Sequence, residues 1–171
     1  MGPQNWWDLA SAINGNLPAP QFAIDIHLYQ NMVASDDSLN VTGHIQKACN
    51  WGNAAKNALI PTYVGEFSVA TNICVNPDGS SFGNDGTQNC TTTGCQCTAT
   101  TPIDVWSSAL KNTTRMYWEA QLQSFEHAAS GYFLWSLHGF GAWSLVDLIN
   151  YNIIGPTIDD RFYGSQCTYT V

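Results

Sequence analysis

Strand-like and helix-like patterns alternate along this chain, and the alternation limits the folds that it can adopt. Three apolar stretches, residues 22–29, 61–67 and 132–137, have the pattern of β-strands. Helical patterns lie before, between and after them, at residues 6–13, 40–59, 101–129 and 142–153. This spacing favours parallel strands joined by right-handed crossovers, hence an α/β fold. Because three strands close poorly, we expect about three-eighths of a barrel, with polar residues at the carboxyl ends of the strands.

The third helical pattern is well marked at both ends. Thr101 is expected to cap it and Gly131 to end it. Before it runs a segment, residues 71–100, that holds four of the six cysteines and is too long for a plain connector. We therefore expect one domain over residues 1–171, with a Cys-rich loop insertion at 72–101.

The charge balance argues against two classes of partner. Acidic residues outnumber basic ones 13 to 5, and the net charge is -8. A chain with so few basic residues is not expected to bind nucleic acid or an anionic membrane surface. No apolar run approaches the ~18 residues of a transmembrane helix. The 171 residues suffice for one domain but are few for a full barrel of about 250.

Cysteines and glycosylation sequons indicate an oxidising compartment. The six cysteines are Cys49, Cys74, Cys90, Cys95, Cys97 and Cys167, and the sequons begin at Asn40, Asn89 and Asn112. With so few charges, these features are typical of a secreted glycoprotein, extracellular or in a cell wall. The alternatives are a cytosolic domain with buried thiols and, at Cys95 and Cys97, a thiolate metal site. The first residues lack a signal-peptide pattern, which suggests that the true N-terminus lies upstream.

Glu66 is the candidate catalytic carboxylate. It ends a short apolar strand, where a carboxylate would face the active-site end of a barrel and could act as nucleophile or base. The alternative is a structural ion pair or a capping acid. The sequence has only two other glutamates, Glu119 and Glu126, and both are expected on the solvated side of the long helix.

Three further residues could contact a sugar. His27 and Tyr29 share one face of a strand near its carboxyl end, where they could donate to a carboxylate or to sugar hydroxyls. The alternative for this pair is two hydrogen-bonded core residues. Trp135 could be a stacking platform for a sugar or a simple core residue.

Six short blocks, in order and at compatible spacing, make the chain resemble a known family. They are Asp25-Ile-His-Leu-Tyr-Gln30, Ala48-Cys-Asn-Trp51, Val64-Gly-Glu-Phe-Ser68, Glu119-Ala-Gln-Leu122 with Phe125-Glu126, Gly131-Tyr-Phe-Leu-Trp-Ser136, and Gln166-Cys167. The chain resembles fungal exo-β-1,3-glucanases of glycoside hydrolase family 5. The resemblance covers nearly the whole chain but only about the latter half of that family's catalytic domain.

The resemblance implies the C-terminal part of a (β/α)8 TIM barrel, strands six to eight, that is incomplete as a lone chain. It implies a retaining mechanism with two glutamates and with neither a metal nor an organic cofactor. Glu66 matches the nucleophile, His27 and Tyr29 match the pair that binds the nucleophile and the first sugar, and Trp135 matches the aromatic floor. Cys49 is matched with Cys167, and Cys74 with Cys95 or Cys97, which leaves one extra pair with Cys90.

Three departures from the family pattern affect the expected activity. The family's acid/base glutamate has no counterpart here. Met32 stands where the family has an aromatic clamp for the next sugar, and residues 137–140 replace a Trp-Lys-Thr-Glu run. Exo-specificity is therefore not expected to follow from the resemblance.

Two functions are consistent with these features. The first is the C-terminal portion of a secreted glucan 1,3-β-glucosidase-like enzyme, inactive alone, whose partners are a β-glucan and the missing N-terminal half of the barrel. The second is a non-catalytic, secreted β-glucan-binding protein that presents Trp135, Trp143 and the Cys-rich loop as a binding surface.

Overall fold

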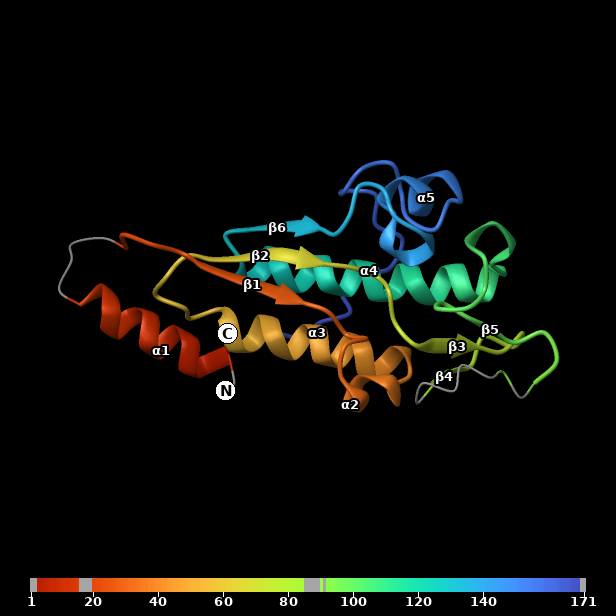
Figure 1. The fold of residues 1–171 in the computed structure, drawn as a ribbon, viewed down its shortest axis with the longest axis horizontal. Helices are drawn as coiled ribbons and strands as arrows, with labels where there is room; N and C mark the ends of the chain where they lie inside the picture. Colours follow the sequence, from red (N-terminus) through yellow and green to blue (C-terminus); the bar gives the residue numbers. More distant parts are fainter. Residues whose placement is uncertain (1–2, 16–19, 85–89, 91, 170–171) are drawn as a thin grey trace.

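The computed structural model describes residues 3–15, 20–84, 90 and 92–169 and has a parallel sheet at its centre (Figure 1). The sheet has the strand order β1-β2-β6, and both neighbouring pairs run parallel. The strands are β1 (Ile24–Leu28), β2 (Thr62–Phe67) and β6 (Gly131–Leu134). The prediction of a parallel α/β fold is therefore confirmed. Within the described ranges the sheet does not close into a barrel, although it is compatible with part of one.

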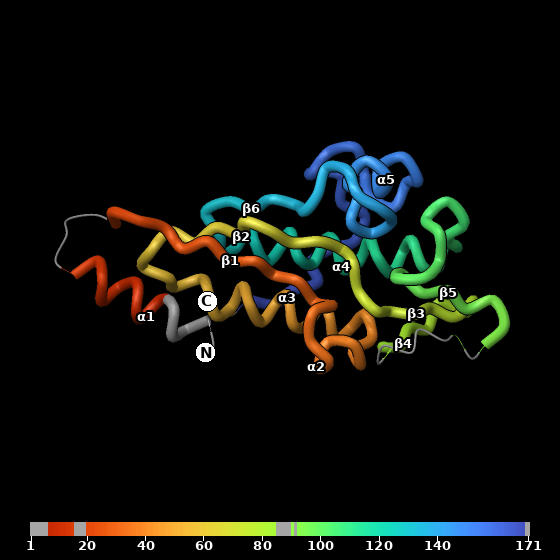
Figure 2. The backbone as a smooth tube through the Cα atoms, viewed as in Figure 1, coloured from red at the N-terminus to blue at the C-terminus, as the bar shows by residue number. Residues whose placement is uncertain are grey.

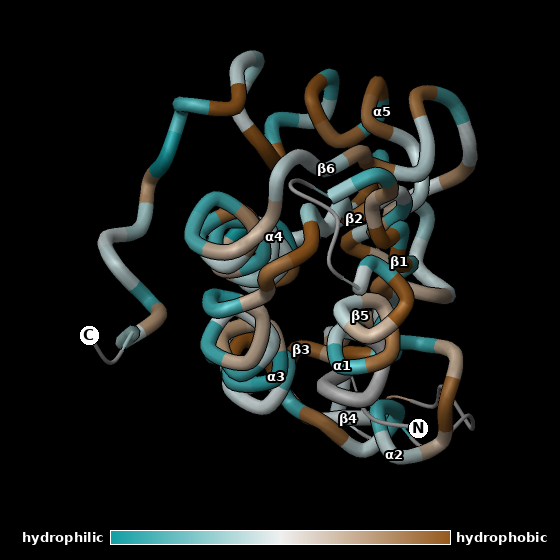
Figure 3. Tube along the Cα trace, turned by 90° about the vertical axis from the view of Figure 1, so that its left-hand side faces the viewer, coloured by the Kyte–Doolittle hydropathy of each residue, from teal (hydrophilic) through white to brown (hydrophobic). Residues whose placement is uncertain are grey.

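Two long helices cover one face of this sheet and leave the other face open. They are α3 (Val41–Ala55) and α4 (Ser108–Ala128), and both lie on the same side of the three strands (Figure 3). Figure 3 also shows the C-terminal segment on the far side of these helices from the sheet. None of the described helices has both the length and the apolar character needed to cross a membrane.

The core lies between the sheet and the helices because alternate strand residues face them. Val64 and Phe67 of β2 are fully buried, and the Phe67 ring stacks on Trp118 of α4 at 5.6 Å between centroids. Phe125, two helical turns further on, meets Phe67 edge to face at 4.9 Å. On the open face Tyr63 is exposed. Burial on one side and exposure on the other fix the register of the strands.

The long helix begins later than predicted. Ser107, not Thr101, is its N-cap, because the Ser107 hydroxyl accepts a hydrogen bond from the backbone N–H of Leu110. The preceding residues form a single 3₁₀ turn, η1 (Ile103–Val105). The Thr101 hydroxyl instead accepts from the N–H of Cys97. The predicted end at Gly131 is also wrong, since the helix ends at Ala128 and Gly131 is the first residue of β6.

The Cys-rich insertion, predicted as a loop, contains a small antiparallel sheet of two- and three-residue strands. Its strand order is β4-β3-β5, with β3 (Ile73–Val75) at the centre, β4 (Ser81–Gly83) on one side and β5 (Gln96–Cys97) on the other. Cys74 and Cys97 are opposite each other in the β3–β5 pair and form a disulfide. The alternation pattern of the sequence was too short here to show strands of two or three residues.

Four shorter elements complete the described fold, and the tube in Figure 2 follows the path that connects them. They are α1 (Pro3–Asn14), α2 (Ala34–Asp37), η2 (Gly141–Trp143) and α5 (Leu145–Asn150). The predicted helix over 142–153 is thus a 3₁₀ turn followed by a short α-helix. Both lie after β6, near the carboxyl end of the sheet (Figure 1).

Candidate functional site

An irregularity in β2 brings Glu66 to the same side of the sheet as His27. Ile26 of β1 is paired with Val64, but the next residue, His27, is paired with Glu66, so that Gly65 is an extra residue. A bulge of this kind shifts the side-chain alternation by one position. Without it, Glu66 would point toward the helices.

Gly65 leaves room at this bulge for a side chain of the neighbouring strand. A Cβ atom on Gly65 would lie 2.0 Å from Oδ1 of Asp25. The missing side chain therefore leaves room for the Asp25 carboxylate. A glycine directly before a glutamate at a strand end was the signal that could have revealed this bulge from sequence.

Glu66 is bound by both of its predicted partners through one oxygen. The Tyr29 hydroxyl donates to Oε2 of Glu66 at 2.5 Å, and Nδ1 of His27 lies 3.3 Å from the same oxygen. The other ring nitrogen of His27, Nε2, lies 3.5 Å from Oδ2 of Asp25. About a quarter of the Glu66 side chain, 26%, is exposed, so a ligand can reach it. The prediction missed Asp25, which orients the imidazole through the ring nitrogen that does not face Glu66.

The phenol of Tyr29 is held in its protonated form. Burial raises the pKa of Tyr29 well above its ordinary value, and the hydrogen bond to Glu66 and the negative charge of that carboxylate raise it further. The Tyr29 ring also packs against Trp143 of η2, with 5.4 Å between ring centroids. Tyr29 is therefore a fixed hydrogen-bond donor toward Glu66.

Trp135 lies at the same edge of the sheet, directly after β6. Its backbone N–H donates to the carbonyl of Phe67, the residue after Glu66, at 2.8 Å. The side chain is 52% exposed, so Trp135 is not a core residue. The peptide bond between Trp135 and Ser136 is cis. His27, Tyr29, Glu66 and Trp135 thus all come from the carboxyl ends of the three parallel strands.

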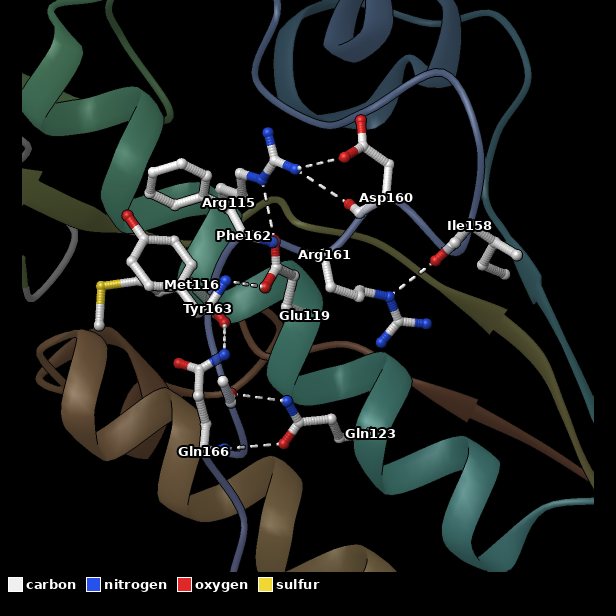
Figure 4. Close-up of polar contacts among 11 residues, drawn as sticks. Arg115, Met116, Glu119, Gln123, Ile158, Asp160, Arg161, Phe162, Tyr163 and Gln166 are labelled. Atoms are coloured by element: carbon white, nitrogen blue, oxygen red, sulfur yellow. Dashed lines mark hydrogen bonds and ion pairs between the residues drawn. The ribbon is translucent and has the colours of Figure 1, made fainter.

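The two other glutamates lie on α4, and both are bound by arginines or by the backbone of the C-terminal segment. Glu119 is completely buried, which contradicts the prediction that it is solvated. It accepts from the backbone N–H groups of Phe162 and Tyr163 and pairs with Arg115 (Figure 4). Glu126 is 45% exposed and pairs with Arg161. Neither carboxylate is available to act with Glu66.

The cysteines are paired in three disulfides. Cys49 is bonded to Cys167, Cys74 to Cys97, and Cys90 to Cys95, which settles the choice that the resemblance left open for Cys74. The four sulfurs of the Cys-rich segment all lie within 4.8 Å of one another. A thiolate metal site would need them reduced, and in these two disulfides no thiolate remains to bind a metal.

Two of the three sequons lie within the described ranges. Asn40 is exposed and is the N-cap of α3, where its Oδ1 accepts from the N–H of Gly43 at 3.0 Å. Asn112 is exposed on α4. Asn89 lies outside the described residues. Glycosylation at these positions stays a prediction.

Comparison with known proteins finds sequence similarity to one group of enzymes. No family model matches the chain. It is 29% identical over 170 residues to a glucan 1,3-beta-glucosidase of Candida oleophila, covering 96% of this chain and 39% of that protein. It is also 29% identical to the enzyme of Schwanniomyces occidentalis, covering 98% and 40%, and to a sporulation-specific glucan 1,3-beta-glucosidase of Saccharomyces cerevisiae, covering 96% and 38%. The resemblance to fungal glucan 1,3-β-glucosidases is thereby confirmed. The chain spans about two fifths of the length of these relatives.

Proposed function

We propose that this chain provides the nucleophile side of a retaining glycosidase site for β-1,3-glucan, with Glu66 as the nucleophile. The observation that supports the proposal most directly is the pair of contacts on Oε2 of Glu66, from Tyr29 at 2.5 Å and from His27 at 3.3 Å. Two strands hold one carboxylate in one orientation at the carboxyl edge of a parallel sheet. The similarity to glucan 1,3-beta-glucosidases supplies the substrate class.

The contacts on Glu66 also give its two carboxylate oxygens different roles. Every described hydrogen bond and ion pair of Glu66 is made by Oε2. Oε1 is then the oxygen that attacks the anomeric carbon. The glycosidic bond breaks as the new carbon–oxygen bond forms, and the leaving oxygen keeps the electron pair and takes a proton from the second carboxyl group. Because Oε2 keeps its donors, the carboxylate is oriented before the sugar arrives. Trp135 lies beside it as an aromatic surface for the sugar ring.

A complete retaining site needs a second carboxyl group about 5–5.5 Å from the nucleophile. The sequence has three glutamates, and the other two pair with Arg115 of α4 and with Arg161 of the C-terminal segment. The 171-residue chain is therefore expected not to hydrolyse laminarin, a β-1,3-glucan, since general-acid help is typically worth about 10²–10⁴-fold. Laminarin turnover that disappears in Glu66→Gln would contradict this expectation.

The nucleophile can be tested separately from the missing acid. A 2-fluoro dinitrophenyl β-glucoside has a leaving group that departs without protonation, and its fluorine slows hydrolysis of the glycosyl ester. Intact-mass and peptide mass spectrometry should find one fluoroglucosyl group on Glu66. Glu66→Gln should show no adduct, and the control Glu126→Gln should react like the original chain. An unmodified Glu66, or an adduct on another side chain, would overturn the proposal.

The second candidate is a non-catalytic β-glucan-binding protein. The half-exposed Trp135, together with Glu66 as the sole glutamate at the sheet edge, favours this candidate. Saturable binding to insoluble β-glucan, a cooperative melt and no adduct on Glu66 would support it over the enzyme.

We further propose that additional parallel strands complete the sheet at β1 and β6. Among the described residues, each of these strands is hydrogen-bonded to a neighbour on one side only. Exposed edges of a parallel sheet are rare, because such sheets are normally covered and continued. These strands would correspond to the earlier part of a barrel, and they would bring the second carboxylate.

We also propose that the protein works in an oxidising, extracellular compartment or cell wall. Three disulfides within the described chain support this proposal, since such bonds persist in secreted proteins. Detection of the protein with intact disulfides in the culture medium or wall fraction would test it, and confinement to a reducing cytosol would contradict it.

A further inference from the structure

Tyr29 lies just beyond the part of β1 that the sheet holds in place. The last residue of β1 is Leu28, which is paired with Phe67 of β2, so Tyr29 is the first residue after the paired region. On its other side β1 has no neighbouring strand among the described residues. The position of the Tyr29 hydroxyl at Glu66 therefore depends on contacts outside the sheet.

One of these contacts is the ring of Trp143, whose centroid lies 5.4 Å from that of the Tyr29 ring. Trp143 also lines a cavity of about 390 Å³ at the same edge of the sheet, so it is not packed on all sides. A ring that borders a cavity can shift, because part of its surface lacks packed neighbours. Trp143 by itself is therefore a weak constraint on Tyr29.

A second contact connects the residue after Tyr29 to a helix. Gln30 is only 7% exposed, and its Oε1 lies 2.9 Å from Nδ1 of His44 on α3. The amide oxygen of Gln30 can only accept, so Nδ1 of His44 carries a hydrogen and donates it. This hydrogen bond joins the chain at the end of β1 to α3.

The surroundings of His44 leave its ring little freedom. His44 is completely buried, and its ring packs against Tyr117 of α4 at 5.5 Å between centroids. Burial lowers the pKa of His44 to about 4, so the ring is neutral near pH 7 and keeps a single N–H. Its other nitrogen, Nε2, has no hydrogen-bond partner in the part of the chain that the structure describes. The one N–H of this buried ring is therefore directed at Gln30.

We propose that His44 is a positioning residue for Tyr29 and, through Tyr29, for the carboxylate of Glu66. Its hydrogen bond to Gln30 fixes the chain next to Tyr29, so that the phenol reaches Oε2 of Glu66. Without this bond the end of β1 can shift, and a misplacement of about 1 Å can cost up to about 10²-fold in rate. The inference rests on the proposed function, in which Glu66 needs a fixed donor on Oε2.

The test compares variants of the full 171-residue chain by two measurements. The first is the rate at which the 2-fluoro dinitrophenyl β-glucoside forms its adduct on Glu66. The second is ¹³C NMR of tyrosine labelled at Cζ, assigned with Tyr29→Phe, which reports the hydrogen bond of the phenol without any reaction. His44→Ala should lower the adduct rate about tenfold and move the Tyr29 signal. His44→Asn keeps an N–H near the position of Nδ1 and should restore both.

Three further variants separate positioning from a loss of stability. Gln30→Ala should reproduce the effect of His44→Ala, and the two changes together should add nothing, because both remove the same bond. It also carries the test if His44→Ala does not fold. Glu119→Gln changes a carboxylate whose described partners belong to α4 and the C-terminal segment, so it should leave both measurements unchanged. Tyr117→Phe removes a buried hydroxyl without a described partner and should also leave them unchanged.

The outcomes distinguish this inference from the proposed function. If Glu66 is labelled and Gln30→Ala keeps the original rate and Tyr29 signal, the positioning role is refuted while the nucleophile stands. A loss of rate that Glu119→Gln shares would also refute it, since destabilisation alone would then explain the effect. If no adduct forms on Glu66 in any variant, the proposed function fails, and the Tyr29 signal still decides whether His44 holds the phenol in place.

Discussion

At the residue scale, the site depends on a phenol that donates to a carboxylate in a partly buried place. Tyr29 loses hydration there and faces the negative charge of Glu66. Both effects disfavour the phenolate, and burial is the larger one. The sequence placed these two residues near each other but could not show that they share a hydrogen bond.

A titration of Tyr29 checks this coupling. Glu66→Gln removes the negative charge, so the pKa of Tyr29 should fall, while remaining above its ordinary value of 10.0 because burial persists. Ultraviolet absorbance of the tyrosinate, with Tyr29→Phe used to assign the transition, measures the change. Glu126→Gln, which leaves the site untouched, should not move the Tyr29 transition. An unchanged Tyr29 pKa in Glu66→Gln would mean that the two side chains are not in contact.

His44 is a second residue whose environment decides its charge. It is completely buried on α3, and its Nδ1 lies 2.9 Å from Oε1 of Gln30, the residue after Tyr29. Burial lowers the pKa of His44 from 6.5 to about 4, although the nearby carboxylates of Asp36 and Asp37 act in the opposite direction. Lys47 adds to the lowering.

This pKa predicts a loss of stability in mild acid. Between pH 6.5 and about 4 the unfolded chain takes up a proton on His44 that the folded chain does not. The free energy of unfolding should therefore fall by about 3 kcal/mol over this window, and His44 should contribute nothing further below it. Urea denaturation at several pH values measures the slope. His44→Gln should flatten the slope, and an equal slope in both proteins would contradict the assignment.

At the element scale, α4 holds the C-terminal segment through the polar side chains of Glu119 and Gln123 (Figure 4). Glu119 accepts two backbone N–H groups, at 2.8 Å from Phe162 and 2.7 Å from Tyr163. One turn further on, Oε1 of Gln123 accepts the N–H groups of Gln166 and Cys167. These side chains replace the neighbouring strand or helix that would otherwise satisfy the backbone of an irregular segment.

Glu119→Gln should destabilise the protein far more than Glu126→Gln. The first change leaves Arg115 without its closest carboxylate in a buried place, which costs about 3 kcal/mol. The second affects a half-exposed pair with Arg161 and should cost less than about 1 kcal/mol. Denaturant unfolding of both variants makes the comparison. Equal effects would indicate that Glu119 is solvated in solution.

Two features of α4, its N-cap and the burial of Glu119, differ from what the local sequence pattern predicts. Thr101 followed by Pro102 has the pattern of a helix start, yet Ser107 caps α4 because the Thr101 hydroxyl is used by Cys97 of the neighbouring sheet. Glu119 is expected in solvent because it lies on the side of the helix opposite Trp118, Leu122 and Phe125. A distant segment, residues 157–169, covers it instead. In both cases a partner far along the chain outweighs the local pattern.

At the scale of the whole molecule, one disulfide joins the first half of the chain to its end. Cys49 of α3 and Cys167 of the C-terminal segment are 118 residues apart in sequence. A cross-link over so long a loop restricts the unfolded chain strongly, and its effect is about 4–5 kcal/mol in the chain-entropy estimate.

Replacing both cysteines should lower the melting temperature more than removing the short-range pair. The first double variant, Cys49→Ser with Cys167→Ser, loses a cross-link between residues 118 positions apart. The second, Cys90→Ser with Cys95→Ser, loses a cross-link between residues only 5 positions apart. Calorimetry of the two double variants, with the remaining disulfides verified by mass spectrometry, measures the difference. A similar loss in both would refute the entropic account.

The sequence by itself determined the parallel α/β arrangement, because the positions of its apolar residues impose strand and helix periods that only this order of elements satisfies. It also predicted Glu66, His27, Tyr29 and Trp135 as site residues, since each lies near the end of a strand pattern. The bulge at Gly65, the cavity beside Trp143 and the burial of Glu119 were decided only in the tertiary structure. The cavity and the burial of Glu119 depend on contacts between segments tens of residues apart, which no local pattern encodes. Gly65 indicates a bulge in the sequence, but the register of the bulge depends on the pairing of β2 with β1.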